Sequence, residues 1–142
     1  MAAKNRSLDG GTTLIESLVV LAIIGLTAAI GFPKLQQALA AVSRRETVSA
    51  VAAELRQARA YALRADRPTQ FVIARDGRAY QGPGSREART AWGVELRPVT
   101  GRAIGFFGDG SSTGGALWVS ARGRSTLIRV APATGAILVG GR

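Results

Sequence analysis

Residues 10–26 of this chain read GGTTLIESLVVLAIIGL, and a single carboxylate, Glu16, lies near the start of this apolar run. A charge inside hydrocarbon is costly, so an ionisable residue in such a segment is a functional candidate by default. Two glycines and a short polar leader with Lys4 and Arg6 precede the carboxylate. This order predicts that a protease cuts the chain beside Glu16.

The apolar run covers residues 12–32, and Glu16 is its only ionisable residue. As a helix it would be about 30 Å long, which matches the hydrocarbon core of a bilayer. Pro33 closes the run, and we expect the helix to kink there because proline lacks a backbone donor and restricts the preceding residue. A plain signal-anchor helix and a cleavable secretory signal remain alternatives, although such a signal has a shorter apolar core of about 7–15 residues.

Residues 33–66 predict an amphipathic continuation of the helix, which Pro68 brings to an end. Apolar residues recur there at steps of three and four, namely Leu35, Ala38 or Leu39, Val42, Val48, Val51 or Ala52, Leu55, Ala58 and Ala62. We expect the second half of this segment to pack on the chain's own domain and the first half to meet other subunits.

Residues 67–142 change to a period of two, which predicts short strands separated by turns. The expected strands are 70–74, 79–81, 91–97, 103–107, 116–121, 126–131 and 136–139, and Asp76-Gly77 is expected to form a hairpin turn between the first two. The expected core residues are Trp92, Phe106, Trp118, Leu127, Ile128 and Ile137. A core this small is marginal alone, so we expect it to dock on the amphipathic helix.

Composition excludes several kinds of site. The 142 residues contain neither Cys nor His, which removes thiol nucleophiles, Ser-His-Asp triads and the usual zinc sites. The acidic residues after Glu16 are scattered, and we expect neither an enzyme nor a metal or cofactor site. The Gly-rich stretch at 108–115 lacks the Lys of a phosphate-binding loop, which favours a loop between strands.

The net charge is +10, from 19 Lys and Arg against 9 Asp and Glu. Such a charge fits nucleic acid, anionic lipid or an acidic partner, but the arginines are spread from Arg44 to Arg142, which favours an ordinary solvated surface. Arg122 and Arg124 are the candidates for contact with DNA or a partner, because arginine binds phosphate bidentately. The competing interpretation of these two residues is a turn between strands.

Taken together, the leader that ends in Gly11, Glu16 as the fifth residue after it, the long apolar helix and the β-rich head resemble type IV pilins and type II secretion pseudopilins. The leader resembles a class III signal peptide. The segment Phe106-Phe107-Gly108-Asp109-Gly110-Ser111-Ser112-Thr113-Gly114-Gly115 and the following strand are similar to the general secretion pathway protein H/FimT group. The chain departs from the usual pattern at Thr12, where these proteins usually have Phe, and at Ser17, where Leu is usual.

The resemblance implies an α+β, pilin-like fold, in which a long N-terminal helix with a membrane-embedded first half packs on a C-terminal antiparallel β-sheet or β-sandwich head. It implies four segments, namely a leader (1–11), a transmembrane part (12–32), an amphipathic part (33–66) and a periplasmic head (67–142).

For processing, the resemblance implies that prepilin peptidase cuts between Gly11 and Thr12 and that Thr12 is then N-methylated. The mature chain would be a single-pass inner-membrane protein that joins a pseudopilus with other major and minor pseudopilins and meets exported proteins. Glu16 would pair with a neighbour's new N-terminal amine during assembly. The alternative is a FimT-like minor pilin that contacts DNA in transformation or pilus biogenesis.

Overall fold

The computed structural model describes the backbone of residues 9–141 and the side chains of residues 13–140. Residues 1–8 of the predicted leader lie outside the described part, and Gly11 and Thr12 are described only as helical backbone. The chain divides into two compact units, with the boundary between Ala38 and Leu39.

Helix α1 (Asp9–Ala65) is one continuous α-helix of 57 residues that contains Pro33. The bend expected at Pro33 stays a prediction. The helix ends as expected before Pro68: Asp66 adopts a φ of 47°, and the Arg67 N–H donates to the Ala62 carbonyl at 3.3 Å. This is the Schellman type of helix end, in which a left-handed residue lets the chain turn back and satisfy a terminal carbonyl.

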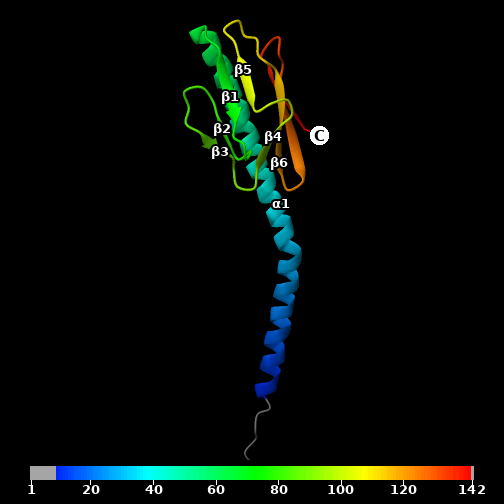
Figure 1. Cartoon of the computed structure of the whole chain (residues 1–142). Coiled ribbons are helices and arrows are strands. Elements are labelled where there is room, and N and C mark those ends of the chain that lie inside the picture. The colour runs from blue at the N-terminus through cyan, green and yellow to red at the C-terminus, as the bar shows by residue number, and fades with distance from the viewer. Residues whose placement is uncertain (1–8, 142) are drawn as a thin grey trace, which may run out of the picture. The chain divides into compact units, whose positions relative to one another are not determined.

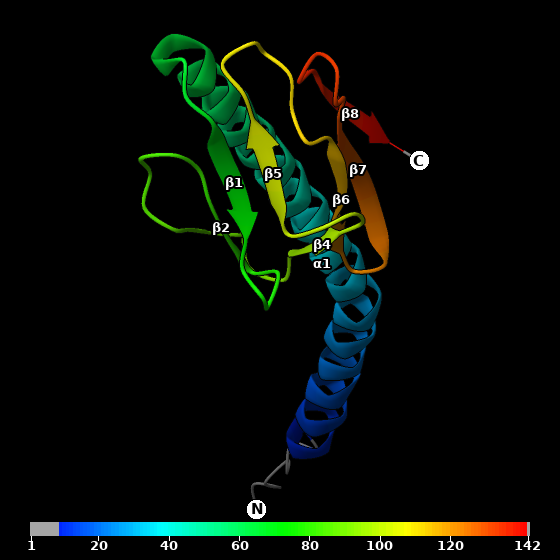
Figure 2. The ribbon, with the colours of Figure 1, turned by 45° about the horizontal axis from the view of Figure 1, so that its top comes forward.

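The strands of the second unit form two antiparallel sheets (Figures 1 and 2). The first has the order β3-β2-β1-β5 and contains β1 (Thr69–Ile73), β2 (Ala79–Gln81), β3 (Ala88–Arg89) and β5 (Ala103–Phe106). The second has the order β4-β6-β7-β8 and contains β4 (Glu95–Pro98), β6 (Gly115–Ala121), β7 (Arg124–Val130) and β8 (Ile137–Gly141). The antiparallel β head on a helix confirms the predicted α+β class.

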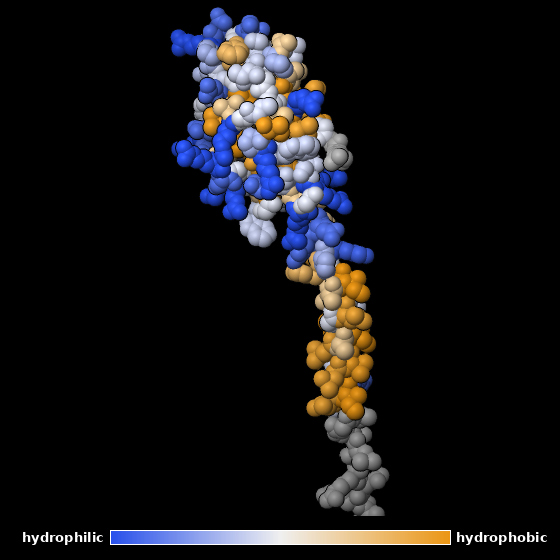
Figure 3. All heavy atoms as spheres, turned by 45° about the vertical axis from the view of Figure 1, so that its right-hand side comes forward, coloured by the Kyte–Doolittle hydropathy of each residue, from blue (hydrophilic) through white to orange (hydrophobic). Residues whose placement is uncertain are grey.

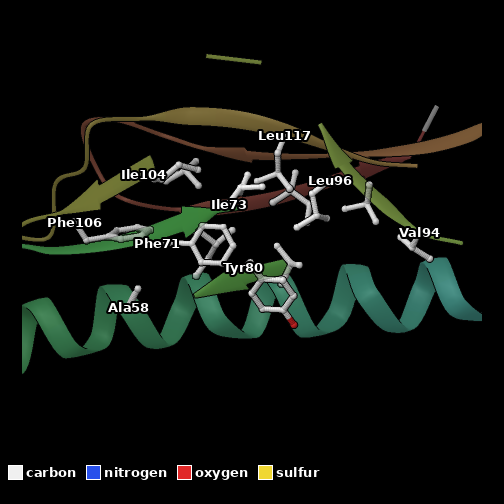
Figure 4. Close-up of a cluster of buried hydrophobic side chains, with 14 of the residues drawn as sticks. Ala58, Phe71, Ile73, Tyr80, Val94, Leu96, Ile104, Phe106 and Leu117 are labelled. Carbon is white, nitrogen blue, oxygen red and sulfur yellow. The ribbon is translucent and has the colours of Figure 1, made fainter. Parts of the chain in front are cut away.

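The core lies between the second half of α1 and the inner faces of both sheets (Figure 4). The helix contributes Val51, Leu55, Ala58 and Ala62, whose spacing keeps them on one face and which are fully buried. The strands contribute alternate residues, as a half-buried sheet requires. These include Phe71, Ile73, Leu96, Ile104, Phe106, Leu117, Val119, Ile128 and Val130. The inward packing expected for the second half of the amphipathic segment is therefore confirmed.

Polar contacts also join the helix to the loops of the head. The buried Thr69 hydroxyl donates to the Ala58 carbonyl at 3.1 Å, and the Ser85 hydroxyl donates to the Glu54 carboxylate at 2.7 Å. Burial raises the pKa of the Tyr80 phenol, and the nearby Glu54 carboxylate adds to this rise.

The expected strand at 91–97 is wrong in its first half. Residues 91–94 form a turn, in which Gly93 has a φ of 75°, and β4 begins only at Glu95. Trp92, expected in the core, sits on this turn with 92% of its surface exposed. The short strand β3 lies between the expected strands 79–81 and 91–97, where no strand was expected.

Trp118 and Leu127 are also not core residues. They stand opposite each other on β6 and β7, and each is half-buried. Their chain neighbours Leu117 and Ile128 are fully buried. Because side chains alternate between the faces of a strand, burial of these neighbours turns Trp118 and Leu127 to the outer face of the sheet. Of the other expected core residues, Phe106 and Ile128 are fully buried, while Ile137 packs on the core from its margin.

The Gly-rich stretch forms the loop between β5 and β6 at residues 107–114, as expected for a loop between strands, although Gly115 already belongs to β6. It folds on itself: the Ser111 hydroxyl and N–H both donate to the Asp109 carboxylate, at 2.6 and 2.9 Å. These two hydrogen bonds lower the pKa of Asp109, with the hydroxyl contributing most. Further along, the Ser112 N–H donates to the Pro132 carbonyl at 2.8 Å, which ties the loop to the β7–β8 connection.

Candidate functional site

The first half of α1 leaves its apolar side chains uncovered by the described chain. Large apolar residues between Leu14 and Phe32 are at least half exposed, for example 67% for Leu14 and 61% for Phe32. Figure 3 shows these side chains as an orange surface. Among the described residues, one helix is long and apolar enough to cross a membrane, with a mean hydropathy of 2.3 and none of the apolar window buried. Such a surface needs lipid or other proteins to cover it.

Glu16 is the one carboxylate of this apolar segment, and it is exposed. The hydroxyls of Ser17 and Thr27, which lie in the same apolar segment, are satisfied by the helix itself. The Ser17 hydroxyl donates to the Thr13 carbonyl at 2.7 Å, and the Thr27 hydroxyl donates to the Ile23 and Ile24 carbonyls. Such back-bonding allows a hydroxyl to sit in an apolar environment, whereas a carboxylate needs an external donor or cation.

Glu16 also lies on a defined face of the helix, which it shares with Thr13, Ser17, Val20 and Leu21. These positions are three or four residues apart, so they form one stripe along α1. A second helix that packed along this stripe would bring its own groups to the carboxylate. The side chain of Thr12 lies outside the described part.

A second candidate site is a cavity of about 620 Å³ in the second unit. Its lining residues are Arg44, Arg97, Trp118, Ser120, Gly123, Arg124, Ser125 and Thr126. They come from α1, from the three strands β4, β6 and β7 of one sheet, and from the turn between β6 and β7. Arg97 and Arg124 are exposed, as expected for a solvated surface, but the fold brings them and Arg44, which are far apart in sequence, to one cavity.

The sheet register explains how this cavity forms. Arg97 on β4 stands directly opposite Trp118 on β6. Ser120 stands opposite Ser125 on β7, and their hydroxyl oxygens are 3.0 Å apart. Arg97 is partly neutralised by Glu95, whose carboxylate lies 3.0 Å from the guanidinium.

The two arginines singled out from the sequence take different positions. Arg122 and Gly123 form the two-residue turn between β6 and β7, in which Ala121 pairs with Arg124. Both turn residues have positive φ, 45° for Arg122 and 76° for Gly123, which is the type I′ hairpin geometry. Arg124 lines the cavity, but Arg122 is exposed on the turn and does not. The expected turn between strands is thus confirmed.

Sequence reasoning missed Arg44, Arg97 and Trp118 as parts of a common site. The alternation of side chains along each strand could be predicted from the sequence, but the pairing of β4 with β6 could not. This pairing brings Arg97 to Trp118. The position of Arg44 one turn before the buried Thr47 was the only available signal, since it places this arginine near the face of α1 that meets the head.

Comparisons with known proteins agree with this architecture. No family model matches the chain. Type II secretion system protein H of Xanthomonas campestris pv. campestris is 31% identical over 116 residues, which cover 75% of this chain and 69% of that protein.

Two crystal structures of the type IV minor pilin FimU of Pseudomonas aeruginosa are similar to the fold, with TM-scores of 0.57 and 0.55. They cover 67% and 73% of this chain and 90% of the FimU chain in each case, at 15% sequence identity. At this identity the likeness concerns the fold, and it places the chain among the pilin-like α+β structures.

Proposed function

This chain belongs to the family of type II secretion system protein H, and on that premise we propose that it is a minor pseudopilin, processed by prepilin peptidase and assembled into or at the tip of the periplasmic pseudopilus. Segment 12–32 then spans the inner membrane, and the head lies in the periplasm. The family and the fold support a structural role in a pilin-like assembly rather than an enzymatic one.

One observation carries this proposal: an apolar helical surface that the described chain leaves uncovered, with one carboxylate on it. Lipid covers the apolar side chains before assembly, but it leaves Glu16 as a costly buried charge. The N-terminal amine of a neighbouring subunit, created by cleavage before Thr12, offers a charge of the opposite sign. A buried ion pair of this kind contributes register more than stability, because its geometry must be specific to offset desolvation.

Processing is tested by co-expressing the chain with prepilin peptidase and determining its N-terminus by mass spectrometry. We expect the mature chain to begin at Thr12 and to carry a methyl group on that amine. Gly11→Val is expected to block the cut, because a side chain before the bond hinders close approach of the protease. Gly10→Val is the matched control and is expected to be cut. A new N-terminus beyond residue 28 would contradict the proposal and indicate an ordinary secretory signal.

The second candidate function is DNA contact by a FimT-like minor pilin. The position of Arg124 beside Arg44 and Arg97 favours it, because clustered arginines bind phosphates. Arg122, the other arginine expected to take part, lies outside the cavity lining.

A further inference from the structure

The cavity lined by Arg44, Arg97, Arg124 and Trp118 plays no part in the assembly of α1 through Glu16. We propose that this cavity, which we call the arginine cavity, binds the carboxylates of an acidic peptide segment on a neighbouring subunit. The identity of the partner rests on the proposed function, since it takes the chain to be part of an assembly. The chemistry of the ligand follows from the cavity itself.

The charges of the cavity are incompletely balanced. Arg97 has a carboxylate partner in Glu95, at 3.0 Å. Within the described residues, Arg44 and Arg124 have no ion pair. The Nε of Arg44 is shielded from solvent and has no hydrogen-bond partner there. Guanidinium and carboxylate form two parallel hydrogen bonds, so a carboxylate in the cavity would give Arg44 and Arg124 the ion-pair partner that they lack.

The surroundings of the cavity favour a peptide over nucleic acid. Trp118 and Leu127 form an outward-facing pair on β6 and β7. Leu127 stands opposite Gly140 of β8, which has no side chain to cover it. On the same face, Leu138 of β8 is 58% exposed. An apolar surface beside a few charges is typical of protein interfaces, where tryptophan and arginine are the usual hot-spot residues.

The carboxylate of Glu95 argues in the same direction. It is bound to Arg97 and is 45% exposed, so it would repel a phosphate chain that contacted Arg97. Duplex DNA draws its affinity from many phosphate contacts, and a fixed carboxylate beside the bound phosphates would repel them and weaken binding. A short acidic segment needs only the two unpaired arginines.

The test uses the full-length chain in a neutral detergent, with Trp92→Phe so that Trp118 is the sole tryptophan. The chain has two tryptophans, so fluorescence in this background reports the arginine cavity directly. Hexaglutamate peptide and a short DNA duplex are the two probes. We expect the peptide to change Trp118 emission saturably, and Arg44→Gln and Arg124→Gln each to weaken its binding about tenfold, which equals about 1.4 kcal/mol.

Arg86→Gln is the matched control, because it removes the same charge from an exposed arginine outside the cavity. It is expected to leave binding within about twofold of the parent. Arg124→Lys keeps the charge but loses the planar guanidinium that binds a carboxylate with two hydrogen bonds, so it is expected to weaken binding as well. Unfolding midpoints of all variants separate loss of binding from loss of fold, and if one glutamine variant is unfolded the other decides the result.

Three results would overturn the proposal: no saturable change with the peptide, an equal loss with Arg86→Gln, or tighter binding of the duplex than of the peptide. The last would identify a nucleic-acid site. Glu16→Leu is expected to bind the peptide normally, because the cavity does not involve Glu16. Failure of assembly through Glu16 and failure of this proposal are therefore distinguishable.

Discussion

Trp92 and Phe106 are both large aromatic residues of the head, and both were expected in its core. Phe106 is fully buried, whereas Trp92 is 92% exposed. The Trp92 turn is nevertheless held firmly. The Thr90 hydroxyl donates to the Val94 carbonyl at 2.8 Å, and the Ala91 N–H donates to the Thr47 hydroxyl at 3.3 Å. Trp92 is thus an exposed residue on an ordered turn.

We predict that Trp92→Ala changes the free energy of unfolding by no more than about 0.5 kcal/mol, because an exposed side chain gains little from folding. Phe106→Ala is the positive control and is expected to cost about 3–5 kcal/mol through lost burial and the cavity left behind. Denaturant unfolding of the full chain in detergent, followed by circular dichroism, measures both. A loss for Trp92→Ala as large as that for Phe106→Ala would contradict the exposed position.

Residue types alone could not distinguish these two aromatics. Phe106 lies two residues after Ile104 on β5, so both side chains point to the same inner face, and the burial of Phe106 could be predicted from that period. Trp92 also lies in an apparently alternating run, but Gly93 with its φ of 75° breaks the strand there. A glycine inside a strand pattern signals a turn or bulge as readily as a continuing strand, and tertiary structure decides between them.

At the scale of elements, the β6–β7 hairpin contains a locally unfavourable residue. Arg122 has a φ of 45°, a region that costs a residue with a Cβ about 1–2 kcal/mol. Natural type I′ turns place Asn or Gly at this position. The arginine is therefore retained there at some cost to the stability of the hairpin.

We predict that Arg122→Asn stabilises the chain by up to about 1 kcal/mol, since Asn tolerates a positive φ better than Arg. Arg86→Asn is a control with the same change in charge, at an exposed arginine without a positive φ. It is expected to be neutral. Thermal unfolding measures both variants, and a lower midpoint for Arg122→Asn than for the parent would be incompatible with strain at this turn.

The packing of the β7–β8 connection on the β5–β6 loop depends on a close approach at Gly135. This glycine has a φ of 60°, and a Cβ added to it would lie 2.6 Å from the Gly110 carbonyl oxygen. Gly110 belongs to the loop that joins β5 to β6, so the absence of a side chain at residue 135 lets the β7–β8 connection pack on that loop.

We predict that Gly135→Ala destabilises the chain more than Gly84→Ala does. Both glycines have positive φ, 60° and 72°, but a Cβ at Gly84 would meet nothing within 4 Å. The backbone cost, about 1 kcal/mol, is therefore shared, and the difference between the two variants measures the clash. Equal denaturation midpoints for the two variants would contradict this prediction, because the β5–β6 loop would then accommodate the added Cβ at no cost in stability.

At the scale of the whole molecule, the class of fold followed from periodicity, since a long apolar run, an amphipathic run and alternating strands each have their own pattern. The position of Glu16 within the apolar part of a helix could be predicted because it depends on one helix. The arginine cavity could not, because it depends on strands that are not consecutive in sequence: β4 pairs with β6 rather than with β5. Long-range pairing of this kind leaves no local signal.

We propose that Glu16 pairs with a neighbour's N-terminal amine in the assembled filament. The most direct test of this pairing is the amount of Glu16→Leu chain that co-purifies with a tagged neighbouring pseudopilin after cross-linking in the membrane. Ser17→Ala is the matched control, because the Ser17 hydroxyl is bonded within its own helix. We predict normal insertion and cleavage for both variants. Assembly is expected to fall more than about tenfold for Glu16→Leu only, since removal of one partner from a buried ion pair costs about 3–5 kcal/mol. Assembly of Glu16→Leu at the level of the parent would contradict the claim.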